Sequence, residues 1–414
     1  SGMTLDECIR LAWKQNPSVR NSVIDIKEAR ADYMAAVGAF LPRAAVNAET
    51  GKRFGRSIDP DTNGYTNETF EEGTVGLDMT LSLFEGFSRI HQVRFRKMNK
   101  ERSEWALKNK QNELAYQVTD AYYKLILERK LLDLALEQSR LSERYLKQTE
   151  VFVELGLKSA SDLQEVKARR EGDIYRYQSR ENSSRIALLH LKQLMNIQPG
   201  DTLAILDTIT ASQLPPYSVS TVETLYAQSI EILPSIRMID LKQKAAHKEY
   251  AIAGGAFSPS VFARFTVGSN YYNTAFSARQ LRDNIGKYVG VGISFPLLSG
   301  LQRLTNQRKL KLNMYRLKNE EELEKQQLYT DIEQTLLSLH TGYSEHQQAL
   351  SQLDAETLVL KESERKWEEG LISVFQLMEA RNRFIAAKAE LVRVRLQIEM
   401  MMKLEKYYRQ GTFL

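Results

Sequence analysis

The sequence contains one cysteine, few prolines and no long hydrophobic run. Cys8 is the only cysteine among 414 residues, which excludes an internal disulfide and a cysteine-rich metal site. No run of about 18 apolar residues occurs, so a transmembrane helix is excluded. A membrane β-barrel is not excluded, because its strands alternate in polarity and keep the mean hydropathy low. The long stretches without any of the 9 prolines favour helices.

The chain also lacks a large excess of positive or negative charge, since 57 Lys and Arg residues nearly balance 52 Asp and Glu residues. The two signs alternate along the chain, so we expect no nucleic-acid partner. The five histidines show no paired metal-ligand spacing, and neither a nucleophile elbow nor a phosphate-binding loop occurs. We therefore expect no enzymatic activity, no cofactor and no bound metal.

Two halves of the chain repeat one pattern. The motif G-L-x-S-x-x-x-L-x-E begins at Gly156 and again at Gly370, 214 residues later. Three further pairs occur in the same order: LFEGFSR at Leu83 with LLSGLQR at Leu297, GAFLP at Gly38 with GAFSP at Gly255, and NPSVR at Asn16 with LPSIR at Leu233. Four ordered matches at nearly constant spacing indicate an internal duplication.

Each half contains a long stretch typical of helix. Residues 86–156 and 300–370 lack proline, and Leu127, Leu134 and Leu141 recur every seven residues, as in helices that pack like a coiled coil. Such a helix would reach roughly 100 Å at 1.5 Å per residue. After the glycine turns, residues 161–195 and 375–406 predict return helices, so we expect a helical hairpin in each half.

A period of two residues precedes each long helix and predicts strands with one apolar face. The same alternation would suit a soluble sandwich, but four strands are few for one, and the opposite faces carry Gly, Ser, Thr and Asp, as beside a water-filled lumen. The partner strands show weaker alternation, at 261–267 and, only suggestively, at 44–54. The predicted lipid-facing residues are Val75, Leu77, Met79, Leu81, Val289, Val291, Ile293 and Phe295.

Four strands cannot close a barrel, and an open edge in lipid would leave backbone groups without hydrogen bonds. The barrel must therefore be shared between chains; a dimer would supply eight strands and a trimer twelve. We expect a first repeat over 1–198 (β-hairpin about 43–84, helical hairpin about 87–196), a linker over 199–220, a second repeat over 221–408 (β-hairpin about 260–297, helical hairpin about 301–406) and a C-terminal tail over 409–414.

The sequence resembles the TolC-like outer-membrane efflux protein family over essentially the whole chain, because these features follow one another in the same order. The matching features are the repeat, the GAF-x-P segments, the FEG and LSG junctions, the G-L-x-S turns and AYYKLI at Ala121–Ile126. The resemblance implies a mostly α fold with a small β part: a homotrimer whose twelve-stranded barrel in outer-membrane lipid continues into a twelve-helix periplasmic tunnel, with the linker in the equatorial region. It also implies a passive exit duct for tripartite efflux or type I secretion, joined by a periplasmic adaptor and an inner-membrane pump.

The resemblance assigns the two G-L-x-S turns to the periplasmic tips that an adaptor contacts. The alternative is that Gly and Ser only turn one helix into the next, although an exposed Leu at a turn calls for a partner. Either Ser159 or Ser161 would cap the first return helix, and Ser373 the second. The tip residues carried over are Gly156, Leu157, Ser159, Gly370, Leu371 and Ser373.

Members of this family narrow the tunnel near the second tip with two acidic residues one turn apart, which fall here on Gln376 and Glu379. Three Glu379 carboxylates near one axis would disfavour anions, whereas a solvated surface Glu is the alternative. The family's resting lock reaches a Ser/Thr-Asp pair, matched by Ser161 and Asp162, but its Arg position holds Ile372. Closure must then rest on other contacts, with Trp367 a candidate.

A soluble coiled-coil scaffold is the rival interpretation, because it accounts for most of the helical sequence. It does not explain the alternating segments placed symmetrically before both long helices. The chain begins Ser1-Gly2 without a charged-then-apolar leader, and we expect that a targeting signal has been removed from it.

Overall fold

The computed structural model describes residues 2–58, 62–207, 209–214, 216–217 and 220–414. The chain divides into two compact units: unit 1 comprises Ser1–Ile24, Trp105–Met238 and Glu322–Leu414, and unit 2 comprises Asp25–Glu104 and Ile239–Glu321. Each unit therefore draws on both halves of the sequence repeat. Parts of the first expected β-hairpin (59–61) and of the expected linker (208, 215, 218 and 219) lie outside the described residues.

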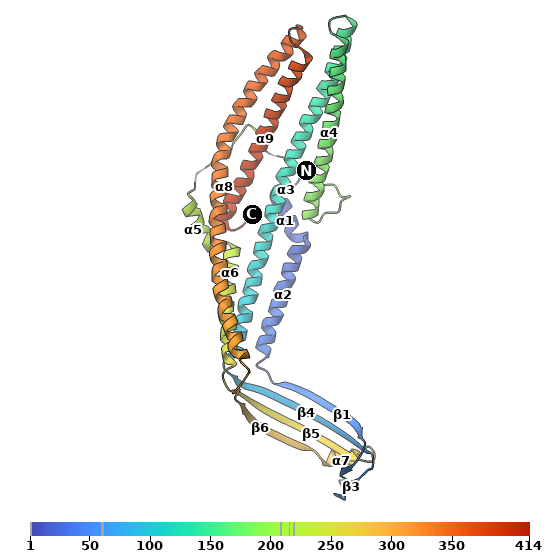
Figure 1. Ribbon diagram of the computed structural model, residues 1–414, viewed down its shortest axis with the longest axis vertical. Coiled ribbons are helices and arrows are strands. Elements are labelled where there is room, and N and C mark those ends of the chain that lie inside the picture. Colours follow the sequence, from blue (N-terminus) through green and yellow to red (C-terminus); the bar gives the residue numbers. More distant parts are fainter. Residues whose placement is uncertain (1, 59–61, 208, 215, 218–219) are drawn as a thin grey trace. The chain divides into compact units, whose positions relative to one another are not determined.

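The described residues form a mostly helical chain with a small sheet (Figure 1). The helices are α1 (Leu5–Gln15), α2 (Pro17–Gly38), α3 (Ser88–Glu154), α4 (Ala160–Leu194), α5 (Val222–Ile232), α6 (Pro234–Gly255), α7 (Ala278–Asp283), α8 (Gln302–Glu368) and α9 (Val374–Gln410). The strands are β1 (Arg43–Arg53), β2 (Ser57–Ile58), β3 (Tyr65–Thr66), β4 (Phe70–Glu85), β5 (Ser260–Asn273) and β6 (Gly286–Ser294). The prediction of two long helices, each followed by a return helix, is confirmed.

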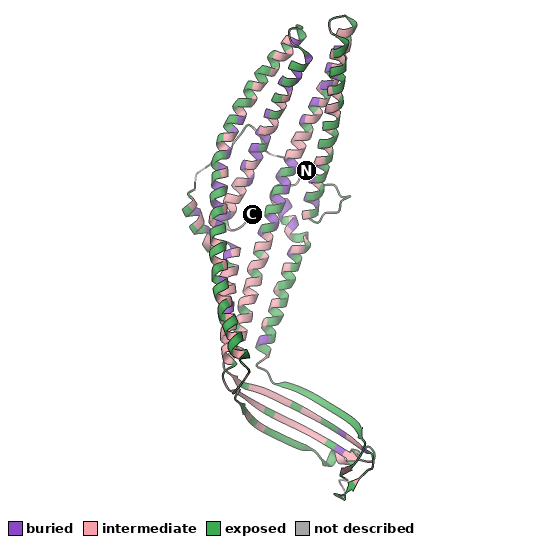
Figure 2. Cartoon of the chain, in the orientation of Figure 1, coloured by how far each residue is buried: buried purple, intermediate pink, exposed green. Residues whose placement is uncertain are grey.

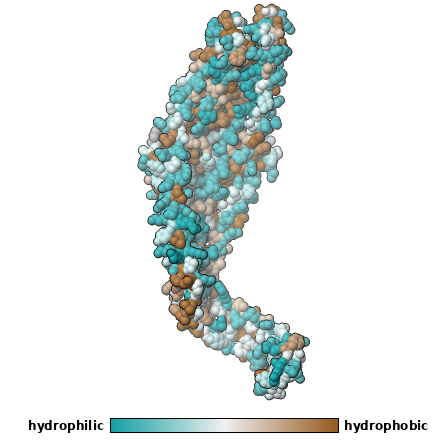
Figure 3. All heavy atoms as spheres, viewed as in Figure 1, coloured by the Kyte–Doolittle hydropathy of each residue, from teal (hydrophilic) through white to brown (hydrophobic). Residues whose placement is uncertain are grey.

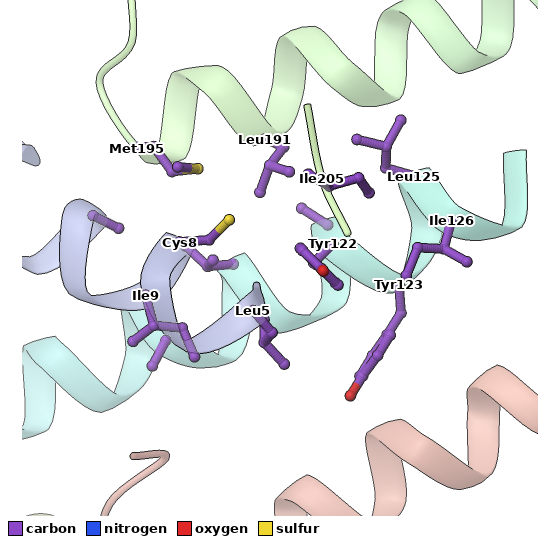
Figure 4. Packing of buried hydrophobic residues seen from close by; sticks show 14 of the residues in the cluster. Leu5, Cys8, Ile9, Tyr122, Tyr123, Leu125, Ile126, Leu191, Met195 and Ile205 are labelled. Carbon is purple, nitrogen blue, oxygen red and sulfur yellow. The ribbon is translucent and has the colours of Figure 1, made fainter. Parts of the chain in front are cut away.

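In unit 1 the helices pack around buried stretches of α3 and α9 (Figure 2). The largest hydrophobic cluster joins α1, α3 and α4, and its members include Cys8, Tyr122 and Leu191 (Figure 4). Cys8 is fully buried, and this burial raises the pKa of its thiol to about 12. The thiol is therefore an inert part of the core.

The segment that joins the two halves is tied to the start of the chain. The N–H of Met3 donates to Ala204 O at 2.8 Å, and Met3 forms a parallel bridge with Ile205. The Tyr122 hydroxyl also donates to Met3 O at 3.2 Å. These bonds hold the segment after α4 against α1 and α3.

In unit 2 four strands form one antiparallel sheet in the order β1-β4-β5-β6. The β1/β4 pair belongs to the first half of the sequence and the β5/β6 pair to the second, and β4 pairs with β5 to join them. Strands β1 and β6 are thus the two edges, and both are exposed along nearly their whole length (Figure 2). The described part of the chain contains no helix long and apolar enough to cross a membrane.

The sheet departs from simple alternation at two points. A β-bulge lies between Ser82 and Phe84, so Leu83 is the extra residue and Phe84, not Leu83, pairs with Val261. Alternation alone would have kept Leu83 on the apolar face. At the other edge, β6 ends at Ser294, one residue before Phe295, which is exposed.

Candidate functional site

The two tips, defined as residues 154–160 and 368–374, are built in the same way. Gly156 and Gly370 have φ of 71° and 78°, in the left-handed region that glycine adopts without strain. The N–H of Leu157 donates to Phe152 O at 2.8 Å, and the N–H of Gly156 donates to Val153 O at 3.0 Å. This pair of bonds is the Schellman motif, which satisfies carbonyls at a helix C-terminus.

The second tip repeats this pair of bonds. Leu371 N–H donates to Lys366 O at 2.8 Å, and Gly370 N–H donates to Trp367 O at 3.0 Å. Because both turns have one geometry, the sequence repeat G-L-x-S corresponds to a repeated structural device.

A serine caps each return helix, and its partner differs between the tips. Ser159 caps α4 and forms a capping box with Asp162. Of the two candidate serines, Ser159 and Ser161, the cap is therefore Ser159. Ser373 caps α9 in the same way with Gln376. Hydrogen bonds from the Ser159 backbone and side chain hold the pKa of Asp162 below its usual value. The first cap is therefore ionic, and the second is neutral.

This difference predicts that only the first tip responds to acid. A carboxyl with a lowered pKa in the folded state stabilises the fold above its unfolded pKa, near 3.8, and that contribution is lost as pH falls through the lower folded pKa. Below about pH 4, amide hydrogen exchange corrected for intrinsic rates should rise around residues 155–163. The Gln376 tip serves as the internal control, and an equal rise at 369–377 would contradict the assignment.

Each tip exposes a leucine that the turn does not need. Leu157 is 65% exposed and Leu371 is 67% exposed, and hydrophobic residues gather at the ends of both helical hairpins (Figure 3). Water-exposed apolar side chains at a turn mark a surface that can gain by contact with a partner.

Asp162, Gln376 and Glu379, the three residues that the resemblance assigns to the constriction and its lock, all make local contacts. Asp162 and Gln376 are the capping partners of Ser159 and Ser373. Glu379 forms an ion pair with Arg383 at 3.2 Å, and Arg383 also pairs with Glu356 at 3.3 Å. Two of the three side chains thus hold their own helix starts, and Glu379 is the one whose charge faces a cation.

Sequence reasoning missed a buried polar cluster near the tips. Asp173 of α4 is 1% exposed, accepts a hydrogen bond from Gln138 Nε2 at 2.9 Å and one from Ser142 Oγ, and pairs with Arg176 at 2.9 Å. On α9, the buried Arg381 donates to Gln138 O at 2.7 Å. The interruption of the Leu134–Leu141 seam by polar Gln138 is the signal that could have indicated this cluster.

Trp367, at the end of α8, packs against α3 and so joins the two helical hairpins. Its ring is 1% exposed and meets Tyr145 edge to face at 5.3 Å between centroids, while the Tyr145 hydroxyl donates to Glu364 at 3.0 Å. Burial raises the pKa of Tyr145 to about 12, so the phenol stays protonated and can donate. Ile372, at the position of the family's Arg, packs against the same hydrophobic cluster.

The sheet has one apolar face that crosses all four strands. Leu77 pairs with Val46 on one side and Val267 on the other, and Val291 pairs with Ala263. Directly paired residues share a face. The opposite face carries mainly polar or small residues, such as Asp78 beside Thr266, together with the aromatic Phe262 and Tyr288. On the apolar face, residues of β6 are far more exposed than core side chains, with Val289 at 76% and Ile293 at 73%.

Within the described residues, no group of three or more His, Cys, Asp or Glu side chains is placed to hold a metal ion.

Comparison with known proteins decides the family. The family model of the outer membrane efflux protein matches residues 8–196 and 225–400, most of the chain. The chain belongs to the outer membrane efflux protein family. It is therefore an outer-membrane efflux duct with a large periplasmic part, and not the coiled-coil scaffold that its helices alone would permit. No curated protein matches the sequence.

Solved structures of outer-membrane channels share the fold of this efflux protein at low sequence identity. The CmeC channel of Campylobacter jejuni has a TM-score of 0.86 at 15% identity, over 98% of this chain and 85% of CmeC. VceC of Vibrio cholerae has a TM-score of 0.82 at 14% identity, over 99% and 97%. The open state of MtrE of Neisseria gonorrhoeae has a TM-score of 0.78 at 17% identity, over 99% and 89%.

Proposed function

We propose that three copies of this efflux protein form one passive exit duct, in which their sheets make a twelve-stranded membrane barrel and their helices a twelve-helix periplasmic tunnel. In this proposal each sequence half, 1–198 and 221–408, supplies one strand pair and one helical hairpin, and residues 199–220 connect them. A periplasmic adaptor and an inner-membrane pump would dock at the tips. The duct would serve tripartite efflux or type I secretion, and it needs no cofactor.

One observation carries this proposal: a four-stranded sheet with a continuous apolar face ends in two strands, β1 and β6, whose outer edges have no partner in the described chain. In lipid an unpaired edge costs several kcal/mol for each unsatisfied backbone group. The β1 edge of one copy meeting the β6 edge of the next removes that cost, and three copies give an even-numbered, closed barrel.

Cross-linking between the edge strands tests the assembly. A variant with Val46→Cys on β1 and Val291→Cys on β6, treated with a short flexible bis-maleimide, should give a ladder that ends at three linked chains. Each single-cysteine variant should stop below three, and the buried Cys8 leaves the background low. A ladder that ends at two chains, or no ladder, would overturn the trimer.

The tip leucines give a prediction about adaptor docking. Leu157→Ser combined with Leu371→Ser should weaken binding of the purified periplasmic adaptor at least about tenfold, because each buried leucine contributes about 1.5–3 kcal/mol. Leu323→Ser is the matched control, since Leu323 is 65% exposed on α8 but lies outside the tips. Surface plasmon resonance would measure both. Equal affinity of the tip variant and the control would assign the glycine-leucine turns to chain reversal alone.

The Glu379–Arg383 pair predicts opposite changes in ion selectivity. If Glu379 lines a constriction, Glu379→Gln should lower the cation preference measured by reversal potentials in planar bilayers, because three carboxylates near one axis disfavour anions. Arg383→Gln should raise it, because it removes the cation that faces this carboxylate at 3.2 Å. Reversal potentials that stay unchanged in both variants would place the pair on an outer, solvated surface.

A further inference from the structure

A cavity of about 630 Å³ in unit 1 has no role in the duct described so far. It lies between α3, α8 and α9 and is closed on one side by the residues that follow α9. Its volume falls in the range of sites that hold drug-sized molecules. The residues that matter for its chemistry are Glu113, Tyr116, Asp331, Tyr407, Tyr408 and Phe413.

One wall of the cavity is aromatic, and ring contacts and a hydrogen bond fix its position. Phe413 is 2% exposed, stacks on Tyr407 with centroids 4.8 Å apart, and meets Tyr116 edge to face at 6.3 Å. The chain turns at Gly411, whose φ is 74°, and Asn112 Nδ2 donates to Gly411 O at 2.9 Å. The C-terminal residues are therefore fixed against α3 and α9, so the wall exists before any ligand arrives.

The charge of the cavity is negative. Glu113 and Asp331 line it, and none of its described lining residues is Lys, Arg or His. Glu113 forms an ion pair with Lys110 at 3.0 Å. Among the described residues Asp331 has no such cation, and it accepts a hydrogen bond from the neutral Gln327 at 2.7 Å. The negative charge of these carboxylates acts on the two tyrosines, Tyr407 and Tyr408. Burial and then the Asp331 charge raise the pKa of Tyr408 to about 12, and burial, Tyr408 and Glu113 raise the pKa of Tyr407.

We propose that this cavity binds an organic cation with a flat apolar body, with the cation beside Asp331 and Glu113 and the body against Tyr116 and Tyr407. Aromatic faces attract cations, and an uncompensated carboxylate adds Coulomb attraction in a site that is partly shielded from water. An anion would meet only repulsion here. A hydrated metal ion would find no set of three ligands among the described residues. This binding site is separate from the proposed duct, which needs three chains, because residues of a single chain line the cavity.

Ethidium, a flat monocation, is a suitable probe for the purified, assembled protein. Its fluorescence titration should saturate at one site per chain above the signal of detergent micelles alone. N-methylacridinium, another flat monocation, should displace it, whereas the anion 1-anilinonaphthalene-8-sulfonate should not. Asp331→Asn should raise the Kd of ethidium about tenfold, a difference of about 1.4 kcal/mol. Tyr116→Leu should raise the Kd about threefold or more by removing an aromatic face.

Matched controls separate this site from general surface charge. Glu333→Gln removes an exposed carboxylate from α8, two residues from Asp331 but outside the cavity lining, and should leave the Kd unchanged. The proposal is overturned by non-saturating binding, by displacement with the anion, or by equal Kd values for Asp331→Asn and Glu333→Gln. The assay requires neither adaptor nor pump, so its failure is distinguishable from failure of the duct.

Discussion

Arginine in place of Leu77 or Val291 should cost about 2–4 kcal/mol per site, because each residue lies near the middle of the apolar face that we assign to lipid. The register supports this placement: Leu77 lies between Val46 and Val267, and Val291 lies beside Ala263. Strands β4 and β6 are separated by β5, so the two costs should add. The measurement is the free energy of unfolding in lipid vesicles, from reversible denaturant titration.

The control for this experiment is an arginine on the other face of the sheet. Asn47 of β1 is exposed, lies on the polar face and donates to Asp78 at 3.1 Å. Asn47→Arg should change the free energy of unfolding little, because the new cation faces water and Asp78. Equal losses for Asn47→Arg and Leu77→Arg, or no loss for either, would contradict the assignment of the two faces.

The features that could be predicted from sequence are those decided by local chemistry. A glycine that must adopt positive φ, followed three residues later by a capping serine, leaves few alternatives for the chain. Gly156 and Gly370 accordingly end their helices as expected. The alternation through Val75–Leu81 likewise predicts a strand with one apolar face, and β4 has that face.

The features that could not be predicted depend on neighbours distant in sequence. Leu83 continues the alternation, yet the bulge removes it from the face because β4 must keep register with Val261 of the other half. Strand β1 carries alanine on both faces, so its alternation is weak, and the pairing of Val46 with Leu77 defines its apolar side. Register is a property of two strands together, and one strand's sequence does not contain it.

Burial of charged residues in the helices is equally non-local. In α4 four charged residues lie close together, and their sequence is typical of a solvent-exposed helix face: Arg169, Glu171, Asp173 and Arg176. Of these four, only Asp173 is buried. The difference arises because Gln138 and Ser142 of α3 point donors at this carboxylate. Which acid of a charged helix faces a partner depends on the rotation of two helices about their axes.

Asp173→Ala should therefore lower the free energy of unfolding by about 2–5 kcal/mol, whereas Glu171→Ala should change it by less than about 0.5 kcal/mol. The loss comes mainly from Gln138 and Ser142, whose buried donors are left without an acceptor at about 1–3 kcal/mol each. Arg176 contributes little to the loss, because its side chain is 48% exposed and can turn to water. Glu171, with 67% side-chain exposure on the same helix, is the matched control.

A triple apolar variant distinguishes unsatisfied donors from lost packing. Asp173→Leu, Gln138→Leu and Ser142→Ala together remove the acceptor and both side-chain donors, so this variant should be more stable than Asp173→Ala. Thermal unfolding followed by circular dichroism gives the order of stability. If the triple variant is the least stable of the set, the carboxylate's contribution is packing and not the satisfaction of buried donors. The expected order instead assigns Asp173 to the alignment of α3 with α4, because only one rotation of the two helices brings both donors to one carboxylate.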